Sequence, residues 1–325
     1  MKAKIHAPTP ANLRRLAAAL RQGELVAIPT ETVYGLAAHA LDAKACRAIF
    51  RAKRRPANDP LIVHVLDLAH AEELADFNPP ARRLARRFWP GPLTLVLPKH
   101  ACVPGIVTSG GPTVAIRAPA HPLARRLLQA ANIPLAAPSA NLFGYISPTN
   151  AAHVSEGLGS RIPHILDGGA CAVGVESTVL DMTNPKKPRV LRPGAVTVAQ
   201  LEKFLGVKVH GAKPRGASAR QLAPGMLERH YSPRTPLVVG RIPTGPVPAG
   251  VAIVLLRQPS GKKTAKHVHW LSRRGALTEV ARNLYDVLRR ADAGRYRLIR
   301  VEPLPADASG LAAAINDRLK RAAKR

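Results

Sequence analysis

The stretch that decides the fold is Lys53-Arg54-Arg55-Pro56-Ala57-Asn58-Asp59-Pro60-Leu61-Ile62-Val63-His64. It follows a predicted helix over residues 42–52 and runs into a buried strand over residues 61–65, which its β-branched side chains indicate. Pro56 and Pro60 stiffen the turn between the two elements. A helix that passes through a short turn directly into a buried strand is typical of an α/β domain.

The same alternation extends from this stretch in both directions. Upstream, Thr9 and Pro10 begin an amphipathic helix that Gly23 ends, and a strand follows over residues 24–28. Downstream, apolar patterns predict strands over residues 93–97, 114–117, 164–166, 178–181 and 190–192, and helices near residues 67–76, 80–89, 121–131, 149–156 and 197–205. The sequence therefore predicts an α/β domain over residues 1–206.

Two further parts follow this domain. Residues 207–225 are rich in Gly, Ala, Pro, Arg and Ser without apolar periodicity, which predicts a linker over residues 207–236. A small α/β domain is predicted over residues 237–325, with strands over 250–256 and 296–301 and helices over 278–291 and 310–322. Within the linker, residues 223–233 contain Arg229, His230 and Tyr231. A featureless linker does not need such a cluster, so we interpret it as a lid.

Composition limits the possible functions. The formal net charge is +29, spread along the chain, which favours polyanions such as RNA or nucleotides as partners. The alternative is that many arginines lie on solvated helix faces.

Three scattered cysteines form no C-x-x-C pair, which fits a reducing compartment. No apolar run approaches about 18 residues and no signal-peptide core is present, so we expect a cytoplasmic protein without a membrane span.

Common nucleotide-binding motifs and the nucleophile elbow of hydrolases are missing from the sequence. It contains no G-x-x-x-x-G-K-[ST], no G-x-G-x-x-G after a strand, and no G-x-S-x-G. Other stretches have the chemistry of an anion site. Lys53 and Arg55 can bind a triphosphate or complement a helix C-terminus. Ser139 and Asn141 lie just past an apolar strand and can hold a ligand or form a plain turn. Arg192 ends a strand before a sharp turn.

Six motifs resemble one known family when they are taken together. They are Pro29-Thr30-Glu31-Thr32-Val33-Tyr34-Gly35-Leu36, Lys53-x-Arg55-Pro56-x-x-x-Pro60-Leu61-Ile62-Val63-His64, Ser139-Ala140-Asn141, Ser147-Pro148-Thr149, Glu176-Ser177-Thr178-Val179 and Arg192-Pro193-Gly194. In this order they are similar to YrdC-type threonylcarbamoyl-adenylate synthases. The stretch from Pro224-Gly225-Met226 to His230-Tyr231 and the C-terminal part resemble the longer, two-domain branch of that family.

The resemblance implies a fold and a reaction. The fold would be a twisted mixed α/β sheet with a concave basic surface, joined to a small Rossmann-like domain. The substrates would be L-threonine, bicarbonate or CO2, and ATP with Mg²⁺. The products would be threonylcarbamoyl-adenylate and pyrophosphate. Other proteins would then transfer the threonylcarbamoyl group to the adenosine beside the anticodon of certain tRNAs, and the basic surface would be able to bind double-stranded RNA.

The resemblance also implies roles for individual residues. Lys53 and Arg55 would be the catalytic cations. L-Threonine would be held by Thr32, His64, Arg117, Ala137 and Ser177, with Arg117 on its carboxylate. ATP would be held by Arg55, Asp59, Thr113, Ser139, Asn141, Ser147, Arg192, His230 and Tyr231, with the last two residues closing over the nucleotide. The resemblance does not identify which residues, if any, would be ligands of the metal.

Three positions depart from the family pattern. Phe143 lies where a small residue is usual, Ala137 lies where a threonine often touches the substrate, and Asp59 replaces a common asparagine. The last change would weaken an ATP contact or recruit magnesium. Two other functions fit the sequence: a module that binds RNA without turnover, and a related carbamoyl-adenylate enzyme with a different acceptor.

Overall fold

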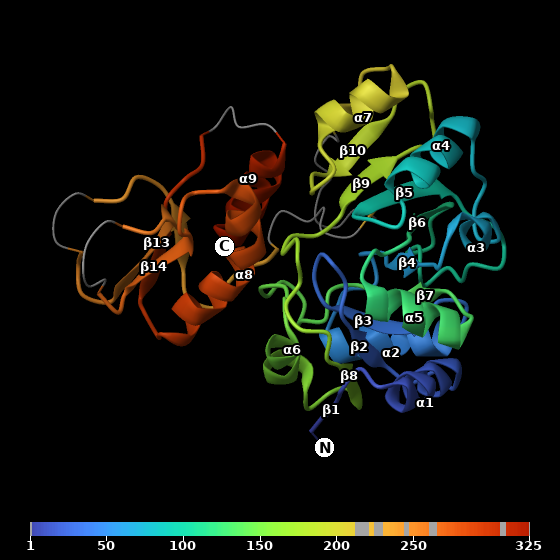
Figure 1. Cartoon of the computed structure of the whole chain (residues 1–325), viewed down its shortest axis with the longest axis horizontal. Coiled ribbons are helices and arrows are strands. Elements are labelled where there is room, and N and C mark those ends of the chain that lie inside the picture. The colour runs from blue at the N-terminus through green and yellow to red at the C-terminus, as the bar shows by residue number, and fades with distance from the viewer. Residues whose placement is uncertain are drawn as a thin grey trace.

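The computed structural model describes residues 2–211, 221–223, 230–243, 247–259, 265–305 and 310–324. It contains two β-sheets, each with its own helices (Figure 1). The mixed α/β class predicted from the sequence is therefore confirmed. A concave basic surface on the larger sheet stays a prediction, as do the domain boundaries at residues 206 and 236.

The larger sheet has eleven strands of mixed direction. It contains parallel pairs such as β4 with β6 and antiparallel pairs such as β5 with β6. In spatial order the strands are β1 (Lys4–His6), β8 (His164–Leu166), β2 (Val26–Ile28), β3 (Gly35–His39), β7 (Leu135–Ala136), β4 (Ile62–His64), β6 (Thr113–Arg117), β5 (Leu93–Pro98), β9 (Thr178–Asp181), β10 (Arg189–Arg192) and β11 (His210–Gly211).

Seven helices accompany the described part of this sheet. Local sequence explains where they begin: Thr9 and Asp42 accept hydrogen bonds from the first turns of α1 and α2 as N-caps, and Pro10 occupies the first position of α1. The helices are α1 (Pro10–Arg21), α2 (Ala43–Lys53), α3 (Leu68–Glu72), α4 (Pro79–Phe88), α5 (Pro122–Ala131), α6 (Ala151–Leu158) and α7 (Val198–Leu205).

The larger sheet is buried on both faces. Side chains of α2, α4 and α6 pack on one face around Leu36, Val63 and Leu95. Side chains of α1 and α5 pack on the other face around Ile28 and Leu135. A sheet covered on both faces leaves its strand ends as the accessible places for polar side chains, and these ends are where the predicted site residues lie.

The smaller sheet is entirely parallel, with the order β12 (Leu237–Val239), β15 (Leu298–Val301), β13 (Val251–Arg257) and β14 (Val268–Ser272). Helices α8 (Leu277–Ala293) and α9 (Leu311–Ala322) pack against each other and lie between this sheet and the first domain (Figure 1). This is the predicted second α/β unit.

The two units share one apolar core. Val33, Ile146 and Val175 come from loops of the first unit, yet they pack among buried residues of α8 and α9. Gly174 permits this approach: its φ is +81°, and a Cβ added to it would lie 2.3 Å from the Cα of Arg282 in α8. A side chain at position 174 would therefore collide with the backbone of α8.

Part of the predicted linker has a defined place. Ala223 is buried against apolar side chains of the larger sheet, and the backbone N–H of Gln221 donates to the carbonyl of Asn58 at 3.2 Å. His230 and Tyr231 are also buried. Residues 224–229 of the predicted lid lie outside the described residues.

Of the helices in the described ranges, none has both the length and the apolarity that crossing a bilayer requires.

Candidate active site

A cavity lies where several strands of the larger sheet begin or end. It contains about 490 Å³ of empty space, its open mouth included. His64, Arg117 and Arg192 are the last residues of β4, β6 and β10. Ten of the predicted site residues line the cavity: Thr32, Arg55, His64, Arg117, Ala137, Ser139, Ser177, Arg192, His230 and Tyr231.

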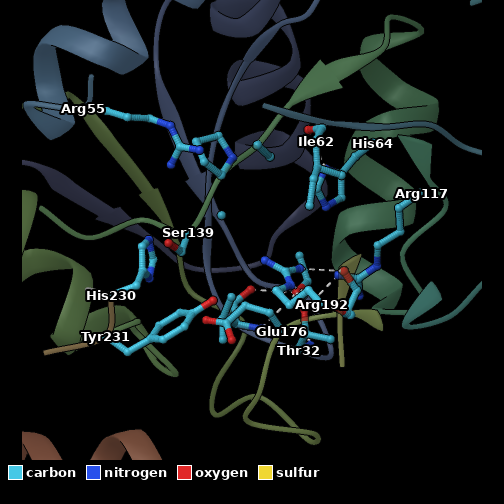
Figure 2. Close-up of a pocket in the computed structure, with 16 residues that line it drawn as sticks. Thr32, Arg55, Ile62, His64, Arg117, Ser139, Glu176, Arg192, His230 and Tyr231 are labelled. Atoms are coloured by element: carbon cyan, nitrogen blue, oxygen red, sulfur yellow. Dashed lines mark hydrogen bonds between the residues drawn. The ribbon is translucent and has the colours of Figure 1, made fainter. Parts of the chain in front are cut away.

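The cavity has two chemically different sides. His64 and Arg117 lie together on one side, whereas Arg55, His230 and Tyr231 lie on the other (Figure 2). This division matches the two sets of residues predicted for L-threonine and for ATP. The cavity therefore brings both predicted sets together, while the contacts of each residue with a substrate stay predictions.

Arg55 lies in the turn after α2 and is fixed by three contacts. Its Nε donates to the carbonyl of Asp59 at 2.9 Å, and its Nη2 donates to the carbonyl of Pro60 at 2.7 Å. Nη2 also lies 2.8 Å from the Asp59 carboxylate, and both side chains are buried. Because the turn already holds this guanidinium in place, it is preorganised to meet an anion in the cavity.

Arg192 is held by the residue that precedes β9. Its Nε donates to the carbonyl of Ser177 at 3.1 Å, and its Nη2 donates to the Ser177 hydroxyl at 3.0 Å. The same hydroxyl lies 2.7 Å from the hydroxyl of Thr94. Ser177 was predicted for threonine and Arg192 for ATP, so this serine connects the two sides of the cavity.

Positive charge exceeds negative charge near Arg55. Burial lowers the pKa of Lys53, and the neighbouring charge of Arg55 lowers it further. Burial also lowers the pKa of Arg55, and Arg192 acts in the same direction. Burial raises the pKa of the Asp59 carboxyl, an effect that Arg55 opposes. Lys53, Arg55 and Arg192 outnumber the nearby carboxylates of Asp59 and Glu176, so a bound polyphosphate would stabilise this group.

Lys53 lies behind the cavity wall, with only 1% of its surface exposed. Its Nζ donates to the backbone carbonyls of Ser139 and Asn141 at 2.5 and 2.6 Å. The structure thus shows Lys53 fixing the loop that presents Ser139 to the cavity. Its predicted role as a cation in direct contact with phosphate stays a prediction.

On the opposite side of the cavity, Arg117 has a separate partner for each nitrogen. Its Nε donates to the carbonyl of Gly91 at 3.1 Å, and its Nη1 donates to the hydroxyl of Thr32 at 2.9 Å. Its Nη2 forms an ion pair with Glu31. Thr32 also contacts the hydroxyl of Thr30 at 2.9 Å. Arg117 is therefore held rigidly at the side predicted for threonine.

His64 and Ala137 complete the threonine side. Burial lowers the pKa of His64 to about 3, and the charge of Arg117 contributes to this shift. The ring is therefore neutral near pH 7 and can hydrogen-bond to a hydroxyl without adding charge. Ala137 packs beside Gly35, where an added Cβ would lie 3.2 Å from the Ala137 methyl group. The methyl group of Ala137 therefore forms a small apolar part of the cavity wall.

His230 and Tyr231 line the ATP side. The Tyr231 ring stacks on Tyr285 of α8, with centroids 5.8 Å apart. The His230 ring meets the edge of Phe143, whose ring also lies 5.9 Å from the guanidinium carbon of Arg55. Neither the Tyr231 hydroxyl nor the His230 Nδ1 has a hydrogen-bond partner among the described residues. Buried polar atoms without a partner indicate that a ligand or a water molecule forms hydrogen bonds with them.

Four other predicted ATP residues do not line the cavity. Asp59 is paired with Arg55, and Ser147 donates to Glu176 at 2.7 Å. The amide nitrogen of Asn141 donates to two backbone carbonyls of its own loop. Thr113 is half-buried at the first residue of β6, at the opposite end of the strand from Arg117. Their contacts with ATP stay predictions.

Six residues of the cavity wall were not predicted: Thr30, Val33, Gly35, Ile62, Pro138 and Glu176. Glu176 is the unexpected charged residue among them, since it places a carboxylate in a cavity rich in cations. It stands next to Ser177 in the quoted motif. A lone acidic residue beside a predicted ligand contact was the signal that could have identified it.

The acidic residues near the cavity do not form a metal site by themselves. In the described ranges, no cluster of three or more His, Cys, Asp or Glu side chains could hold a metal ion. Glu31, Asp59 and Glu176 each pair with an arginine instead. Mg²⁺ prefers phosphate and water oxygens with few protein carboxylates, and its binding together with ATP stays a prediction.

Comparison with known proteins gives the family. A family model for Sua5, YciO and YrdC proteins, described as "Telomere recombination", matches residues 18–194, more than half of the chain. The chain belongs to the Sua5–YciO–YrdC family. A second model, described as the C-terminal domain of threonylcarbamoyl-AMP synthase, matches residues 196–324. The resemblance seen in the sequence motifs is therefore confirmed.

Similar members of the Sua5–YciO–YrdC family extend over nearly the whole chain. The threonylcarbamoyl-AMP synthase of Pyrococcus abyssi is 42% identical and covers 95% of this chain and 93% of its own length. That of Bacillus subtilis is 41% identical and covers 96% and 92%.

Solved structures of the Sua5–YciO–YrdC family agree with this similarity. The crystal structure of P. abyssi Sua5 complexed with L-threonine superposes with a TM-score of 0.88 at 39% identity, and covers 99% of this chain and 98% of that one. Escherichia coli YciO superposes with a TM-score of 0.53 at 22% identity over 59% of this chain and 96% of its own. The second likeness supports the fold of the first unit alone.

Proposed function

We propose that this protein is an L-threonylcarbamoyladenylate synthase, a nucleotidyltransferase. It would convert L-threonine, bicarbonate or CO2, and ATP into threonylcarbamoyl-adenylate and pyrophosphate. One observation carries the proposal: a single cavity has Arg117 and His64 on one side and Arg55 on the other, with Arg192 on the wall between them. Relatives that are similar over nearly the whole chain and bear the name threonylcarbamoyl-AMP synthase support it.

The threonine side offers complementary groups for an amino acid. Arg117 supplies a fixed cation for the carboxylate, and neutral His64 with Thr32 supplies hydrogen-bond partners for the hydroxyl. Ser177 completes this side, and the methyl group of Ala137 leaves room for the substrate's own methyl group. The amine then faces the interior of the cavity, where it can react with CO2.

The ATP side offers fixed positive charge. Arg55 and Arg192 would offset the charge of the triphosphate, and Mg²⁺ bound to the phosphate oxygens would offset more of it. Ser139 would contact the nucleotide from the loop that Lys53 holds. His230 and Tyr231 would cover the nucleotide from the opposite side. Their polar atoms without partners support this placement.

The chemistry needs no side-chain nucleophile. The neutral amine of threonine adds to CO2 and loses a proton, which gives a carbamate. A carbamate oxygen then forms a bond to the α-phosphorus of ATP, the bond from that phosphorus to the bridging oxygen breaks, and pyrophosphate leaves. Two anions must meet, so offsetting charge and positioning are the protein's main contributions. A buried cavity also shelters the unstable product from water.

The product would serve a tRNA modification. Other proteins would transfer its threonylcarbamoyl group to the adenosine beside the anticodon, and they are the downstream partners in this proposal. A cytoplasmic location fits this role and the three free cysteines. The net charge of +29 supports an additional contact with RNA, including double-stranded RNA.

Mass detection of threonylcarbamoyl-adenylate, with each substrate omitted in turn, tests the proposal. Product and pyrophosphate should form only when threonine, bicarbonate and Mg-ATP are all present. Product formation with serine but not with threonine would indicate a carbamoyl-adenylate enzyme with a different acceptor. RNA binding that weakens steeply with salt, together with no turnover of any amino acid, would instead identify an RNA-binding module.

A further inference from the structure

The carboxylate of Glu176 is shared by the two units of the protein. Its Oε1 accepts a hydrogen bond from the Ser147 hydroxyl at 2.7 Å. Its Oε2 accepts one from the Tyr285 hydroxyl at 2.9 Å and one from Nε of Arg318 at 2.8 Å. Tyr285 belongs to α8 and Arg318 to α9, whereas Glu176 lines the cavity of the first unit (Figure 2). The C-terminal unit therefore reaches the cavity wall.

This contact is a buried ion pair. Arg318 and Glu176 are 1% and 5% exposed, and Tyr285 is fully buried. Burial raises the pKa of the Glu176 carboxyl, but Arg318 and then Arg192 more than offset this, so its pKa lies at about 2. Glu176 is thus ionised near neutral pH. An ionised carboxylate beside a triphosphate would repel it unless a fixed cation offset the charge.

The same two side chains also hold Tyr231. The guanidinium carbon of Arg318 lies 5.3 Å from the centre of the Tyr231 ring, and Tyr285 stacks on that ring with an interplanar angle of 25°. Cation–π and stacking contacts of this kind orient an aromatic side chain. Glu176 and Tyr231 both line the cavity, and side chains of α8 and α9 contact both of them.

We infer that Arg318 and Tyr285 are positioning residues for the ATP side of the cavity, acting through Glu176 and Tyr231. The C-terminal unit would thereby complete the site without touching a substrate. This inference rests on the proposed function, because it assigns Arg318 and Tyr285 to the ATP half of that reaction. Threonine binding should be far less sensitive, since Arg117 and His64 take no hydrogen bond or ion pair from α8 or α9 among the described contacts.

The way the units dock supports a fixed arrangement rather than a loose contact. Arg289 of α8 donates to the carbonyl of Ile146 at 2.6 Å and lies over the ring of Tyr145. The Tyr145 hydroxyl donates to Asp292 of α8 at 2.7 Å. Ile146 precedes Ser147, and Arg289 follows Tyr285 by one turn of α8, so these contacts lie next to the Glu176 network and hold α8 in place beside it.

A double-mutant cycle on the full chain tests the inference through kinetics. Arg318→Met should raise the KM for ATP about tenfold or more, the scale of a lost hydrogen bond to a charged group, and change the KM for threonine less than about twofold. Glu176→Gln removes the charge that Arg318 offsets. Arg318→Met combined with Glu176→Gln should therefore recover ATP affinity by about fivefold relative to Arg318→Met alone. Arg290→Met, an exposed change on α8, serves as the matched control and should leave both KM values unchanged.

Tyr285→Phe provides a second variant that keeps the stacking on Tyr231. It removes only the hydroxyl bonded to Glu176 and should raise the KM for ATP about threefold. If Arg318→Met does not fold, the double variant Arg318→Lys with Tyr285→Phe should also raise the KM for ATP. Lysine keeps the charge but loses the fixed direction of Nε.

The outcomes separate the inference from the proposed function. Absence of product with the unmodified protein would reject the function. An active unmodified protein whose Arg318 variants keep a normal KM for ATP would overturn the inference. It would also be overturned if both KM values rose equally, or if Glu176→Gln gave Arg318→Met no recovery, since each result would mean that Arg318 only stabilises the fold.

Discussion

Arg117 and Glu31 form a buried ion pair in which Nη2 and Oε1 lie 2.5 Å apart. Burial raises the pKa of the Glu31 carboxyl, but the charge and hydrogen bond of Arg117 outweigh this and hold that pKa below its ordinary value. The cation proposed for the substrate carboxylate thus already has a carboxylate partner from the protein. Glu31 orients the guanidinium, while the contacts to Gly91 and Thr32 fix its other nitrogens.

Arg117→Lys should weaken threonine binding selectively. A lysine has one ammonium group and cannot donate to Gly91, Thr32 and Glu31 in the same geometry. We expect the KM for threonine to rise about tenfold or more, with the KM for ATP within about twofold of normal. Steady-state kinetics with each substrate varied in turn would measure both. Arg125→Lys on α5, whose Nη1 donates to the carbonyl of Leu66, is the matched control. Equal changes in both KM values would contradict the assignment.

Lys53→Met should reduce stability as well as activity. The substitution removes the donor for the carbonyls of Ser139 and Asn141. An unsatisfied buried carbonyl costs about 1–3 kcal/mol, so the free energy of unfolding should fall by at least that amount. Denaturant titration would measure it, and Lys44→Met on the exposed face of the same helix is the control. An unchanged unfolding curve together with lost turnover would show that Lys53 acts on phosphate directly.

Asp59→Asn should strengthen ATP binding. The buried carboxylate of Asp59 offsets part of the positive charge of Arg55, and asparagine keeps the shape without that charge. We expect the KM for ATP to fall about threefold, because less negative charge then opposes the triphosphate. Kinetics at several Mg²⁺ concentrations would test this. A higher KM that extra Mg²⁺ restores would show that Asp59 recruits the ion.

His64 should make stability depend on pH in the acid range. Its pKa lies at about 3 in the folded protein, against an ordinary value of 6.5. As pH falls from 6.5 toward 3, the unfolded chain binds a proton that the folded chain does not. The contribution of the neutral His64 to the free energy of unfolding is therefore fully present above pH 6.5. On acidification below pH 6.5 the free energy of unfolding falls by up to about 1.4 kcal/mol per pH unit. Denaturant titrations of the unmodified protein and His64→Asn between pH 4 and pH 7 would compare the slopes. Identical slopes would contradict the prediction.

The sequence predicted the helices because their apolar periodicity extends over many residues, and it predicted most strands from their β-branched apolar runs. It missed β1, β3 and β11, which lack such runs, and β12, whose apolar run has only three residues. It also identified ten residues of the cavity wall, because the family motifs place them at strand ends. It did not identify the contact of Glu176 with Arg318, since 142 positions separate these residues and no local pattern links them.

The direction in which a side chain points could not be predicted from the sequence either. Lys53 and Arg55 are two residues apart, and both were predicted to meet phosphate. Arg54 between them has a φ of +53° and ends α2 in the left-handed region, so the chain turns at that point. Arg55 therefore lines the cavity, whereas Lys53 points behind the loop that carries Ser139.

The close approach at Gly174 has a consequence for the length of the protein. Val33, Ile146 and Val175 are buried in one apolar cluster with side chains of α8 and α9. A chain that stopped near residue 206 would present these side chains to water as one apolar patch, and such patches promote self-association. A shortened form would need hydrophilic replacements at these three positions to remain monodisperse, and a size-exclusion profile of the truncated chain would reveal the difference.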